Sequence, residues 1–284
     1  MKIGTLETRN TRDLIGPSTR FCAMVSAPAK FGKTKLAASL NEITTKYRNK
    51  PCLFIAFEAA EGGGTMSVAD MGIDYVMPSN FDEVESVLAG LATNDYYGGI
   101  IFDNATDYVL RTVKPHAMKF PTKEKLLGAR IAGVPVRGDY QTMGEVARGQ
   151  LNKLVNLTNE TTPEKFRKDL IVTALEKEVQ DDDGNVTGIV PNLPGALAGV
   201  ATAMFQSVIG IRIKPEVIPD PNGKAGSTKR LSVRRLHVKA DGVRVTDDRS
   251  GIWQHDYRLT DNDGQPIGLL PMYEEWLERF KVKV

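Results

Sequence analysis

The sequence predicts an α/β protein whose mainly parallel sheet is flanked by helices. Apolar runs at 21–25, 52–57 and 100–102 carry no charge, as expected of strands that are buried on both faces of a sheet. Segments with helical spacing separate these runs, and strands that alternate with helices favour a parallel sheet. The first run leads into a Gly-Lys-Thr tripeptide and a helical pattern, which is the strand–loop–helix layout of a phosphate loop.

The elements can be assigned in order along the chain. We expect an extended polar lead-in over 1–19, a core strand over 20–26 and a helix over 33–48. Ser79 or Asn80 is placed to cap a helix that runs to about 91, because acidic residues follow in its first turn. The other expected elements are strands at 52–57, 75–76, 98–104 and 169–175, a helix over 141–159, a polar loop over 178–194, a hairpin of strands near 205–213 and 230–239, and a helix over 272–280.

Composition limits the class of protein. The chain has 284 residues, 41% hydrophobic and 25% charged, which suits one large α/β domain or a core with a small appendage. A net charge of +2 means that any contact with nucleic acid needs a local basic patch. Cys22 and Cys52 fall in predicted buried strands, which favours core thiols in a reducing compartment. No apolar run suits a membrane span or a signal peptide, so we expect a cytoplasmic protein without a membrane partner.

The segment after the first strand has the chemistry of a nucleotide site. The N–H groups of such a loop, with a helix N-terminus behind them, form a nest for phosphate. Lys33 would reach the β- and γ-phosphates of ATP, and the Thr34 hydroxyl would ligate Mg²⁺. Ala27 stands where the pattern normally has glycine, and a chance tripeptide in an ordinary strand–turn–helix is the alternative. The residues expected to bind nucleotide are Ala29, Lys30, Phe31, Gly32, Lys33, Thr34 and Lys35.

Acidic residues follow the predicted strands, where parallel sheets bind their ligands. Asp103 ends an apolar strand at the Walker-B position and would hold Mg²⁺, unless it caps the next helix. Glu58 ends the strand after the phosphate-loop helix and could polarise the attacking water, with Glu61 as a rival. The plainer alternative for Glu58 is a solvent-facing loop acid. Glu176 or the adjacent Lys177 could sense the γ-phosphate.

These segments resemble those of the RecA-like ATPases. The run 52–58 is similar to the strand of that family whose closing glutamate is catalytic, which carries this role to Glu58. The run 100–106 resembles the family's Walker-B strand, with Asp-Asn where Asp-Ser is usual. The resemblance covers about 20–251 and implies a RecA-like core with a C-terminal β-hairpin extension. The chain then divides into a lead-in over 1–19, an ATPase core over 20–251 with a basic insertion at 114–140, and a tail with a short helix over 252–284.

The resemblance also implies contact with single-stranded DNA. Residues 172–178 and 190–195 are similar to segments of phage-encoded RecA-like nucleotide-binding proteins, some of which anneal single strands, although Leu175 stands where that group often has histidine. The family's DNA-contacting loops correspond here to 114–140, which is basic, and to 178–194, whose three consecutive aspartates disfavour phosphate contact. The candidate DNA-binding residues are Lys119, Lys123, Lys125 and Arg130, with a solvated insertion as the alternative. A second basic cluster comprises Lys224, Lys229, Arg230, Arg234 and Arg235. This cluster could contact DNA, or it could form a charged surface of the hairpin.

An arginine near the C-terminal end of the predicted core indicates that copies of the chain assemble with one another. The segment 245–251 resembles the part of ring-forming relatives that reaches into a neighbouring subunit's ATP site. Arg249 keeps the arginine of that pattern, whereas Asp247 replaces its lysine. The resemblance therefore implies a head-to-tail homo-oligomer, ring or filament, in which Arg249 completes the next subunit's site. A surface ion pair with Asp247 or Asp248 is the alternative.

Two functions from different classes follow. The first is an Mg²⁺-dependent ATPase that assembles head-to-tail and binds single-stranded DNA in phage-type recombination or annealing, in the host cytoplasm if it is phage-encoded. The alternative is a nucleotide-dependent assembly or regulatory ATPase that does not bind DNA. A kinase is disfavoured, because the sequence shows no lid-type arginine cluster and no acceptor site.

Overall fold

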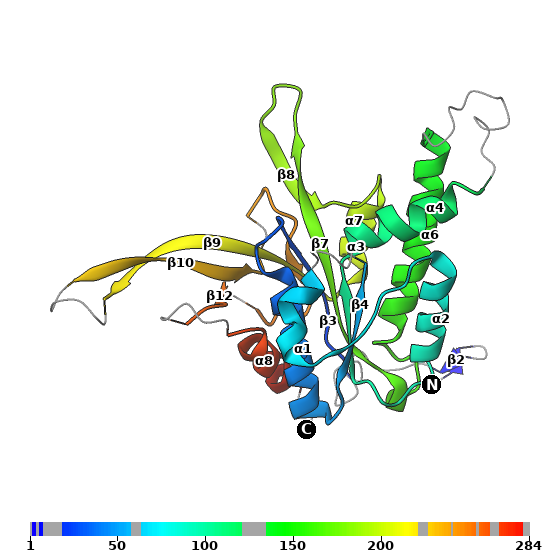
Figure 1. The fold of residues 1–284 in the computed structure, drawn as a ribbon, viewed down its shortest axis with the longest axis horizontal. Helices are drawn as coiled ribbons and strands as arrows, with labels where there is room; N and C mark the ends of the chain where they lie inside the picture. Colours follow the sequence, from blue (N-terminus) through cyan, green and yellow to red (C-terminus); the bar gives the residue numbers. More distant parts are fainter. Residues whose placement is uncertain are drawn as a thin grey trace.

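A mainly parallel sheet forms the centre of the protein (Figure 1). The structure is a computed structural model that describes residues 2–3, 6–7, 19–57, 64–120, 135–220, 227–239, 241–253, 256–261 and 267–280. The strands of the sheet are β3 (Cys22–Ala27), β4 (Cys52–Ala56), β5 (Asp74–Val76), β6 (Gly99–Asp103), β7 (Asp169–Gln180), β8 (Val186–Pro191), β9 (Ser207–Pro219), β10 (Thr228–His237), β11 (Asp247–Asp248) and β12 (Tyr257–Arg258). Two short strands, β1 (Lys2–Ile3) and β2 (Leu6–Glu7), pair with each other within the predicted lead-in.

The strand order places the phosphate-loop strand β3 inside the sheet. The order is β12-β10-β9-β3-β7-β6-β4-β5, while β8 pairs with β7 and β11 with β9. From β9 to β5 all neighbours run parallel, so their carboxyl ends share one edge of the sheet. β9 and β10 form the predicted antiparallel hairpin, which projects from the core as a long arm in Figure 1. The predicted α/β fold, a mainly parallel sheet flanked by helices with a C-terminal hairpin extension, is confirmed.

Both faces of the sheet are covered. Along β3, Ala23 and Val25 belong to one hydrophobic cluster, whereas Cys22 and Met24 belong to the other. This alternation within an all-apolar strand explains why the core strands read as continuous apolar runs. The helices of the first face are α1 (Lys33–Arg48) and α8 (Leu270–Phe280). Those of the second are α2 (Phe81–Leu91), α3 (Ala105–Tyr108), η3 (Val109–Val113), α4 (Lys114–Ala117), α6 (Arg137–Asn156) and α7 (Leu197–Met204), and the short helices η2 (Gly64–Met71) and η4 (Glu164–Phe166) lie in connections.

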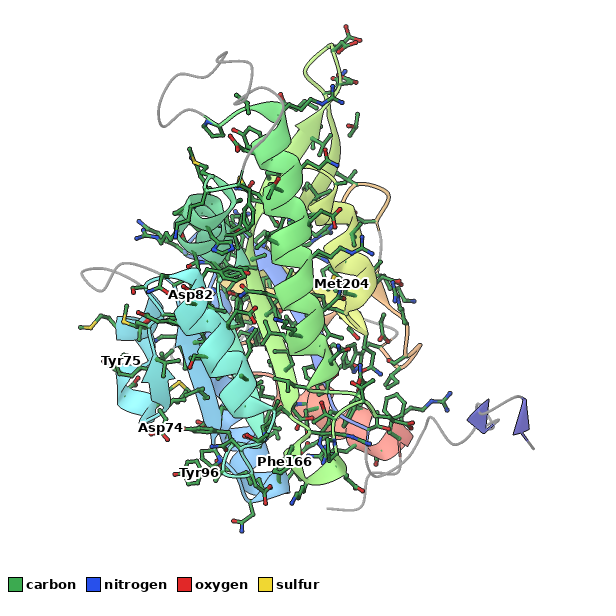
Figure 2. All side chains as sticks on the ribbon, turned by 90° about the vertical axis from the view of Figure 1, so that its right-hand side faces the viewer. Asp74, Tyr75, Asp82, Tyr96, Phe166 and Met204 are labelled. Carbon is green, nitrogen blue, oxygen red and sulfur yellow. The ribbon has the colours of Figure 1, made fainter. Side chains whose placement is uncertain are left out.

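The long helix α6 dominates the second face. Figure 2 shows it running along the sheet between α2 and α7, whose last residue, Met204, is labelled. It begins at Arg137 rather than near 141, since the Asp139 carboxylate accepts the N–H of Val136 at 3.0 Å and closes the first turn. Asn80 caps α2 by accepting the N–H of Glu83 at 3.0 Å, which selects between the two predicted caps. No helix in the described part of the chain is both long enough and apolar enough to cross a membrane.

The prediction of a polar loop over 178–194 is wrong, because most of this segment forms a β-hairpin. β7 continues to Gln180, and β8 returns beside it with Glu178 opposite Ile189. At the turn the Asp181 carboxylate accepts the N–H of Asn185 at 2.8 Å, and Gly184 adopts a φ of 83° that suits glycine. The Asp- and Gly-rich composition marks this hairpin turn, not an unstructured connection.

The two thiols confirm the prediction that they are core residues. Cys22 lies in β3 and Cys52 in β4, and both are free and buried. Burial raises the pKa of Cys22 to about 11 and that of Cys52 further above its usual range. Both side chains are therefore neutral and unreactive at physiological pH.

A buried carboxylate ties the chain together at the amino-end edge of the sheet. Asp169 is 0% exposed and accepts the N–H of Phe21 at 2.8 Å. It also accepts from the Tyr273 hydroxyl at 2.7 Å and from Arg48 Nε at 3.3 Å. Burial, together with the neighbouring Asp169, raises the pKa of Tyr273 far above its usual value, so this hydroxyl remains a donor. The first core strand, α1, β7 and α8 thus share one hydrogen-bonded centre.

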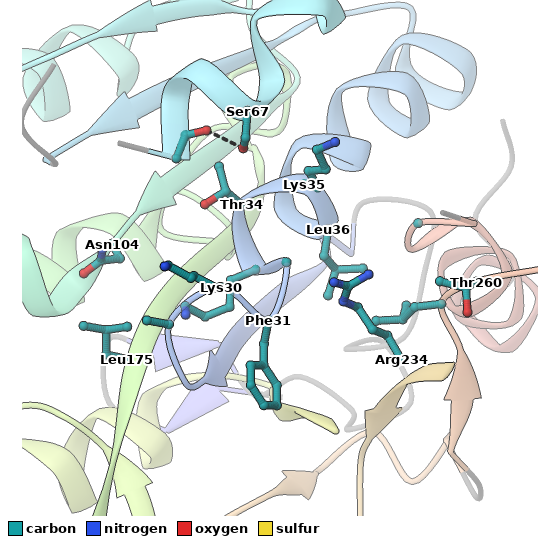
Figure 3. Close-up of a pocket in the computed structure, with 16 residues that line it drawn as sticks. Lys30, Phe31, Thr34, Lys35, Leu36, Ser67, Asn104, Leu175, Arg234 and Thr260 are labelled. Atoms are coloured by element: carbon teal, nitrogen blue, oxygen red, sulfur yellow. Dashed lines mark hydrogen bonds between the residues drawn. The ribbon is translucent and has the colours of Figure 1, made fainter. Parts of the chain in front are cut away.

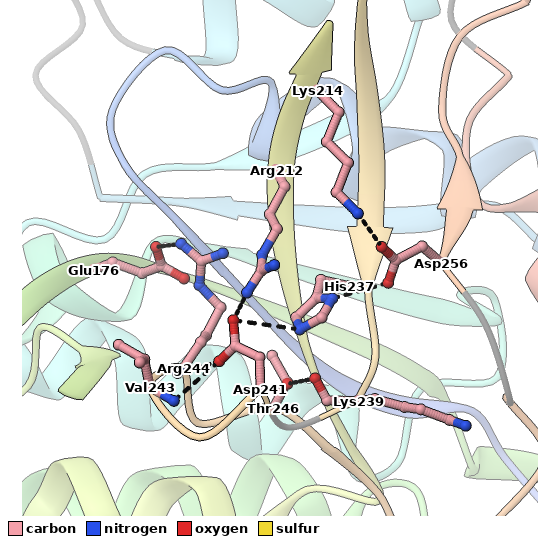
Figure 4. A network of polar contacts seen from close by, with 10 residues as sticks. All are labelled: Glu176, Arg212, Lys214, His237, Lys239, Asp241, Val243, Arg244, Thr246 and Asp256. Carbon is pink, nitrogen blue, oxygen red and sulfur yellow. Dashed lines mark hydrogen bonds and ion pairs between the residues drawn. The ribbon is translucent and has the colours of Figure 1, made fainter. Parts of the chain in front are cut away.

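A polar network holds the base of the β9–β10 arm against the core (Figure 4). Arg244 Nη2 donates to Glu176 Oε2 of β7 at 2.9 Å, and Thr246 Oγ1 donates to the Lys239 carbonyl at 2.7 Å. Burial lowers the pKa of His237, although its hydrogen bond with an aspartate opposes this effect. The other ion pairs of the network join Arg212 to Asp241, Lys214 to Asp256 and His237 to Asp256. The position of β10 relative to the core strands is thereby fixed.

Candidate functional site: a phosphate-loop pocket

The loop between β3 and α1 has the backbone of an anion nest. β3 ends at Ala27, α1 begins at Lys33, and the Gly32 carbonyl accepts the N–H of Leu36 at 3.0 Å. Lys30 and Gly32 have φ values of 65° and 91°. The value at Gly32 suits a residue without a Cβ atom. Left-handed residues between right-handed ones turn successive N–H groups toward one point, so the loop can cradle a phosphate chain.

Three of the predicted side chains meet at the carboxyl edge of the sheet. Thr34 Oγ1 donates to Asp103 Oδ2 at 2.9 Å, and the second carboxylate oxygen accepts from the Thr173 hydroxyl. Lys33 Nζ donates to two main-chain carbonyls at the start of the loop, at 2.8 and 3.0 Å. Asp103 is only 2% exposed and Lys33 only 7%. The Lys33 ammonium and the Asp103 carboxylate are therefore largely shielded from bulk water, which makes the electrostatic effect of their charges stronger, and the partly buried Thr34 hydroxyl lies beside the carboxylate.

The helix cap that was the alternative role for Asp103 is formed by the next residue, Asn104. Asn104 Oδ1 accepts the N–H of Asp107 at 2.8 Å and so caps α3. This cap leaves the Asp103 carboxylate to Thr34 and Thr173. From the sequence, Asp103 could either hold Mg²⁺ or cap the helix. The side-chain geometry assigns the cap to Asn104.

A cavity of about 600 Å³ opens over the loop (Figure 3). All the predicted nucleotide-binding residues, 29–35, line it. The lining also contains residues that sequence reasoning did not assign to the site: Leu36, Gly64, Ser67, Asn104, Leu175, Arg234, Leu259, Thr260 and Gly268. Most of these residues come from β10 and from other segments far from the loop in the chain, so the loop motif could not have indicated them.

Among these additional residues, Gly64 has a local sequence feature that could have indicated its place in the site. It ends a run of three glycines, and a Cβ atom at Gly64 would lie 2.4 Å from Thr34 Oγ1. Glycine is required here because the main chain passes directly over the threonine hydroxyl. The last glycine of the run therefore reflects a close approach to the site.

The acids proposed for catalysis and sensing have different positions. Glu58 and Glu61 lie outside the described residues. Glu176 accepts from Ser26 Oγ at 3.0 Å in addition to its ion pair with Arg244. Both of its carboxylate oxygens are thus bound within the protein, which favours a structural role.

Arg249 lies at the opposite end of the sheet from the phosphate loop. Its N–H donates to the Gln206 carbonyl at 3.0 Å, just before the start of β9, and β9 runs parallel to β3. Arg249 is exposed, and within the described residues its side chain forms no ion pair. The alternative pairing with Asp248 is not seen, because that carboxylate accepts from Ser207 Oγ at 2.9 Å and from nearby main-chain N–H groups. Arg249 therefore cannot reach the pocket of its own chain.

Of the four candidate DNA-binding residues, Lys119 is described. It is exposed and follows α4. Lys123, Lys125 and Arg130 lie outside the described residues.

The donor set fits Mg²⁺. Within the described residues no group of three or more His, Cys, Asp and Glu side chains is arranged to hold a metal ion. Mg²⁺ in nucleotide sites normally takes only one or two protein ligands, while water and the phosphates supply the rest. Thr34 and Asp103 match that requirement. They would hold an ion that offsets the negative charge of the bound phosphates.

No family model and no curated protein matches the chain. Among solved structures, the chain is similar to the crystal structure of a KaiC-like protein from the hyperthermophilic archaeon Pyrococcus horikoshii, with 15% identity, coverage of 85% of each chain and a TM-score of 0.43. The strand order and the pocket together define the class of this protein: it is an α/β protein with a mainly parallel sheet and a phosphate loop.

We expect Asp103→Asn to weaken the dependence of nucleotide binding on Mg²⁺. The amide keeps the shape of the side chain but removes the charge that supports the cation. Loss of a supporting ligand of this type commonly reduces metal affinity by about 10–100-fold. The measurement is a Mg²⁺ titration of ATP binding by calorimetry, with the exposed Asp82→Asn as the matched control. An Mg²⁺ midpoint equal to that of the wild type would remove Asp103 from the metal site.

Proposed function

We propose that this protein binds ATP with Mg²⁺ and hydrolyses it at the phosphate loop. The observation that carries the proposal is the 2.9 Å hydrogen bond between Thr34 Oγ1 and Asp103 Oδ2 inside the loop pocket. A threonine after the loop lysine and an acid at the end of a core strand are the parts that hold Mg²⁺ on ATP. Their contact requires α1 and β6 to be packed in register, which a chance tripeptide does not provide.

The chain around Glu58 supports its role as the base. Glu58 follows Phe57 directly, and the Phe57 N–H donates to the Asp103 carbonyl at 3.0 Å. Gly64, the next described residue, lies beside Thr34, since a Cβ atom there would come within 2.4 Å of Thr34 Oγ1. Phe57 and Gly64, the described residues that flank the two candidate bases in the chain, thus both lie beside the proposed metal site.

Glu58→Gln should retain ATP binding and lose turnover. A positioned general base contributes roughly 10²–10⁴ in rate, so a decrease of about that size is expected. Turnover is followed by phosphate release and binding by calorimetry, with Lys33→Ala as the variant that loses binding itself. Wild-type hydrolysis by Glu58→Gln would eliminate it as the base, and Glu61→Gln would then be tested in the same way.

Head-to-tail assembly is the second part of the proposal. The pocket of one chain lies at the carboxyl edge of the sheet, whereas the exposed Arg249 lies at the amino edge. A contact that joins opposite edges of two copies would be heterologous and would generate a ring or a filament. Such a contact can bring Arg249 of one copy to the γ-phosphate held by the next.

Mixing two inactive variants tests this arrangement. Arg249→Ala and Glu58→Gln should each lose most ATPase activity, since an inserted arginine contributes roughly 10³–10⁵ in turnover. A mixed assembly contains some junctions with both residues intact, so activity should partly return. Arg279→Ala, which removes another exposed arginine, should remain active throughout. Full activity of Arg249→Ala in the assembled protein would exclude an arginine finger.

The third part of the proposal is binding of single-stranded DNA in phage-type recombination or annealing. It is supported by the excess of lysine and arginine over 114–140, and by the exposed Lys119 at its described end. The β7–β8 hairpin is a poorer candidate because Asp181, Asp182 and Asp183 occupy its turn. An assembly or regulatory ATPase that does not bind DNA remains the second candidate, favoured by the net charge of only +2.

Replacing Lys119, Lys123, Lys125 and Arg130 with alanine should weaken DNA binding and reduce its salt dependence. Each lost phosphate contact lowers the slope of log affinity against log salt by about 0.7. Fluorescence anisotropy with an oligothymidine measures the slope. A control that replaces the exposed Lys46, Lys153, Lys165 and Arg279 removes the same charge elsewhere. Equal slopes in both variants would show that 114–140 does not contact DNA. An ATPase rate that is insensitive to DNA would favour the second candidate.

A further inference from the structure

The pocket continues beyond the part that the phosphate loop explains. Asn104 and Leu175 lie at one end of the pocket in Figure 3, near Thr34, and Arg234 and Thr260 lie at the other. The loop passes between these ends. Leu36, Leu259 and Gly268 complete the second end, which we call the distal wall together with Arg234 and Thr260.

The distal wall is fixed to the phosphate-loop helix and to β10. The N–H of Leu269 donates to Ser39 Oγ of α1 at 3.0 Å, and a Cβ atom at Gly268 would lie 2.7 Å from Ser39 Cβ. The N–H of Leu259 donates to the Arg234 carbonyl at 2.8 Å. The wall is therefore a built part of the pocket, held to α1 by a hydrogen bond to the Ser39 side chain and to β10 by a main-chain hydrogen bond.

Arg234 places a positive charge beside the loop, and no carboxylate among the described residues pairs with it. A Cβ atom at Gly32 would lie 3.7 Å from both Cδ and Nε of Arg234. Within the described residues Arg234 forms no ion pair, although its neighbours on the arm do. These pairs are Arg212–Asp241, Lys214–Asp256, Arg235–Glu216 and Arg258–Glu216. A cation beside an anion nest, with no ion-pair partner among the described residues, suits a bound anionic ligand.

Thr260 supplies a second, independent observation. Its side chain is 4% exposed, yet within the described residues Oγ1 has no hydrogen-bond partner. A buried hydroxyl without a partner costs about 1–3 kcal/mol, so native structures rarely leave one unmatched. Its position on the distal wall places this hydroxyl where a ligand can satisfy it.

The direction of a nucleotide in the pocket follows from the metal site. The lysine of a phosphate loop reaches the β- and γ-phosphates, and the threonine holds the metal on them. Asp103 and Thr34 therefore mark the γ-phosphate end. The nucleoside must leave the loop at the other end, toward Arg234 and Thr260.

Building on the proposed function, we propose that the distal wall binds the nucleoside of ATP within the same chain. The planar Arg234 guanidinium stacks on the base, and the Thr260 hydroxyl bonds to a polar atom of the sugar or base. Leu36 and Leu259 supply the apolar surface on which the nucleoside packs. Arg234 is therefore a nucleotide-positioning residue from the hairpin extension, with a role separate from DNA contact and from that of Arg249.

Tripolyphosphate has the phosphates of ATP but no nucleoside, so its binding distinguishes effects on the phosphate site from effects on the nucleoside site. For Arg234→Ala we expect ATP and ADP to bind about tenfold more weakly, as loss of a stacked cation implies. Tripolyphosphate should bind as it does to the wild type. Thr260→Val, which keeps the shape of the side chain, should weaken ATP in the same selective way. Arg234→Lys keeps the positive charge but lacks the planar guanidinium group, so this variant should not restore ATP affinity. Arg230→Ala, an exposed arginine of the same strand, is the matched control.

The outcomes are distinguishable by calorimetry with Mg²⁺ present and thermal unfolding as a check of folding. An unchanged ATP affinity in folded Arg234→Ala and Thr260→Val would overturn the nucleoside site alone. Equal weakening of ATP and tripolyphosphate would also overturn it, because Arg234 would then bind phosphate. If the wild type binds neither ligand, or if Lys33→Ala binds both as well as the wild type, the proposed function itself fails.

Discussion

The Asp103 carboxylate is the contact on which the site depends. It is buried at the end of β6, and a buried charge is costly unless its oxygens are hydrogen-bonded. One oxygen accepts from Thr34 at the start of α1, and the other accepts from Thr173 in β7. The phosphate-loop helix and two strands must therefore be packed correctly before this charge is tolerated. The same packing brings together Thr34 and Asp103, the two candidate metal ligands, at the end of the phosphate loop.

The parallel sheet explains why the chemistry gathers at its edges. Its central strands are buried on both faces, so polar side chains can be accommodated only where the strands end. At the carboxyl edge the result is the phosphate-loop pocket. At the amino edge the buried Asp169 binds the first core strand, α1 and α8, which is a structural use of the same principle. Arg249 lies at this second edge and is therefore separated from the pocket by the length of the strands.

The C-terminal extension is part of the pocket. β10 is held to β9 along its length, and the network around Glu176 and Arg244 fixes the base of the arm to β7. Because of these attachments, Arg234 is brought beside the phosphate loop although it is about 200 residues away in the chain. Binding of a nucleotide would therefore be coupled physically to the arm, which projects far from the core.

The sequence by itself determined the α/β class, the phosphate loop, α1 at 33–48 and Asp103 at the end of its strand. These features are local, since they depend on apolar runs, helical spacing and residues that are adjacent in the chain. The tertiary structure decided which residue caps α3, that 178–194 is a hairpin, and that Arg234 and Thr260 belong to the pocket. Each of these depends on contacts between distant segments. Composition could indicate that β10 is basic, but only the packing of the strands decides which of its arginines faces the loop.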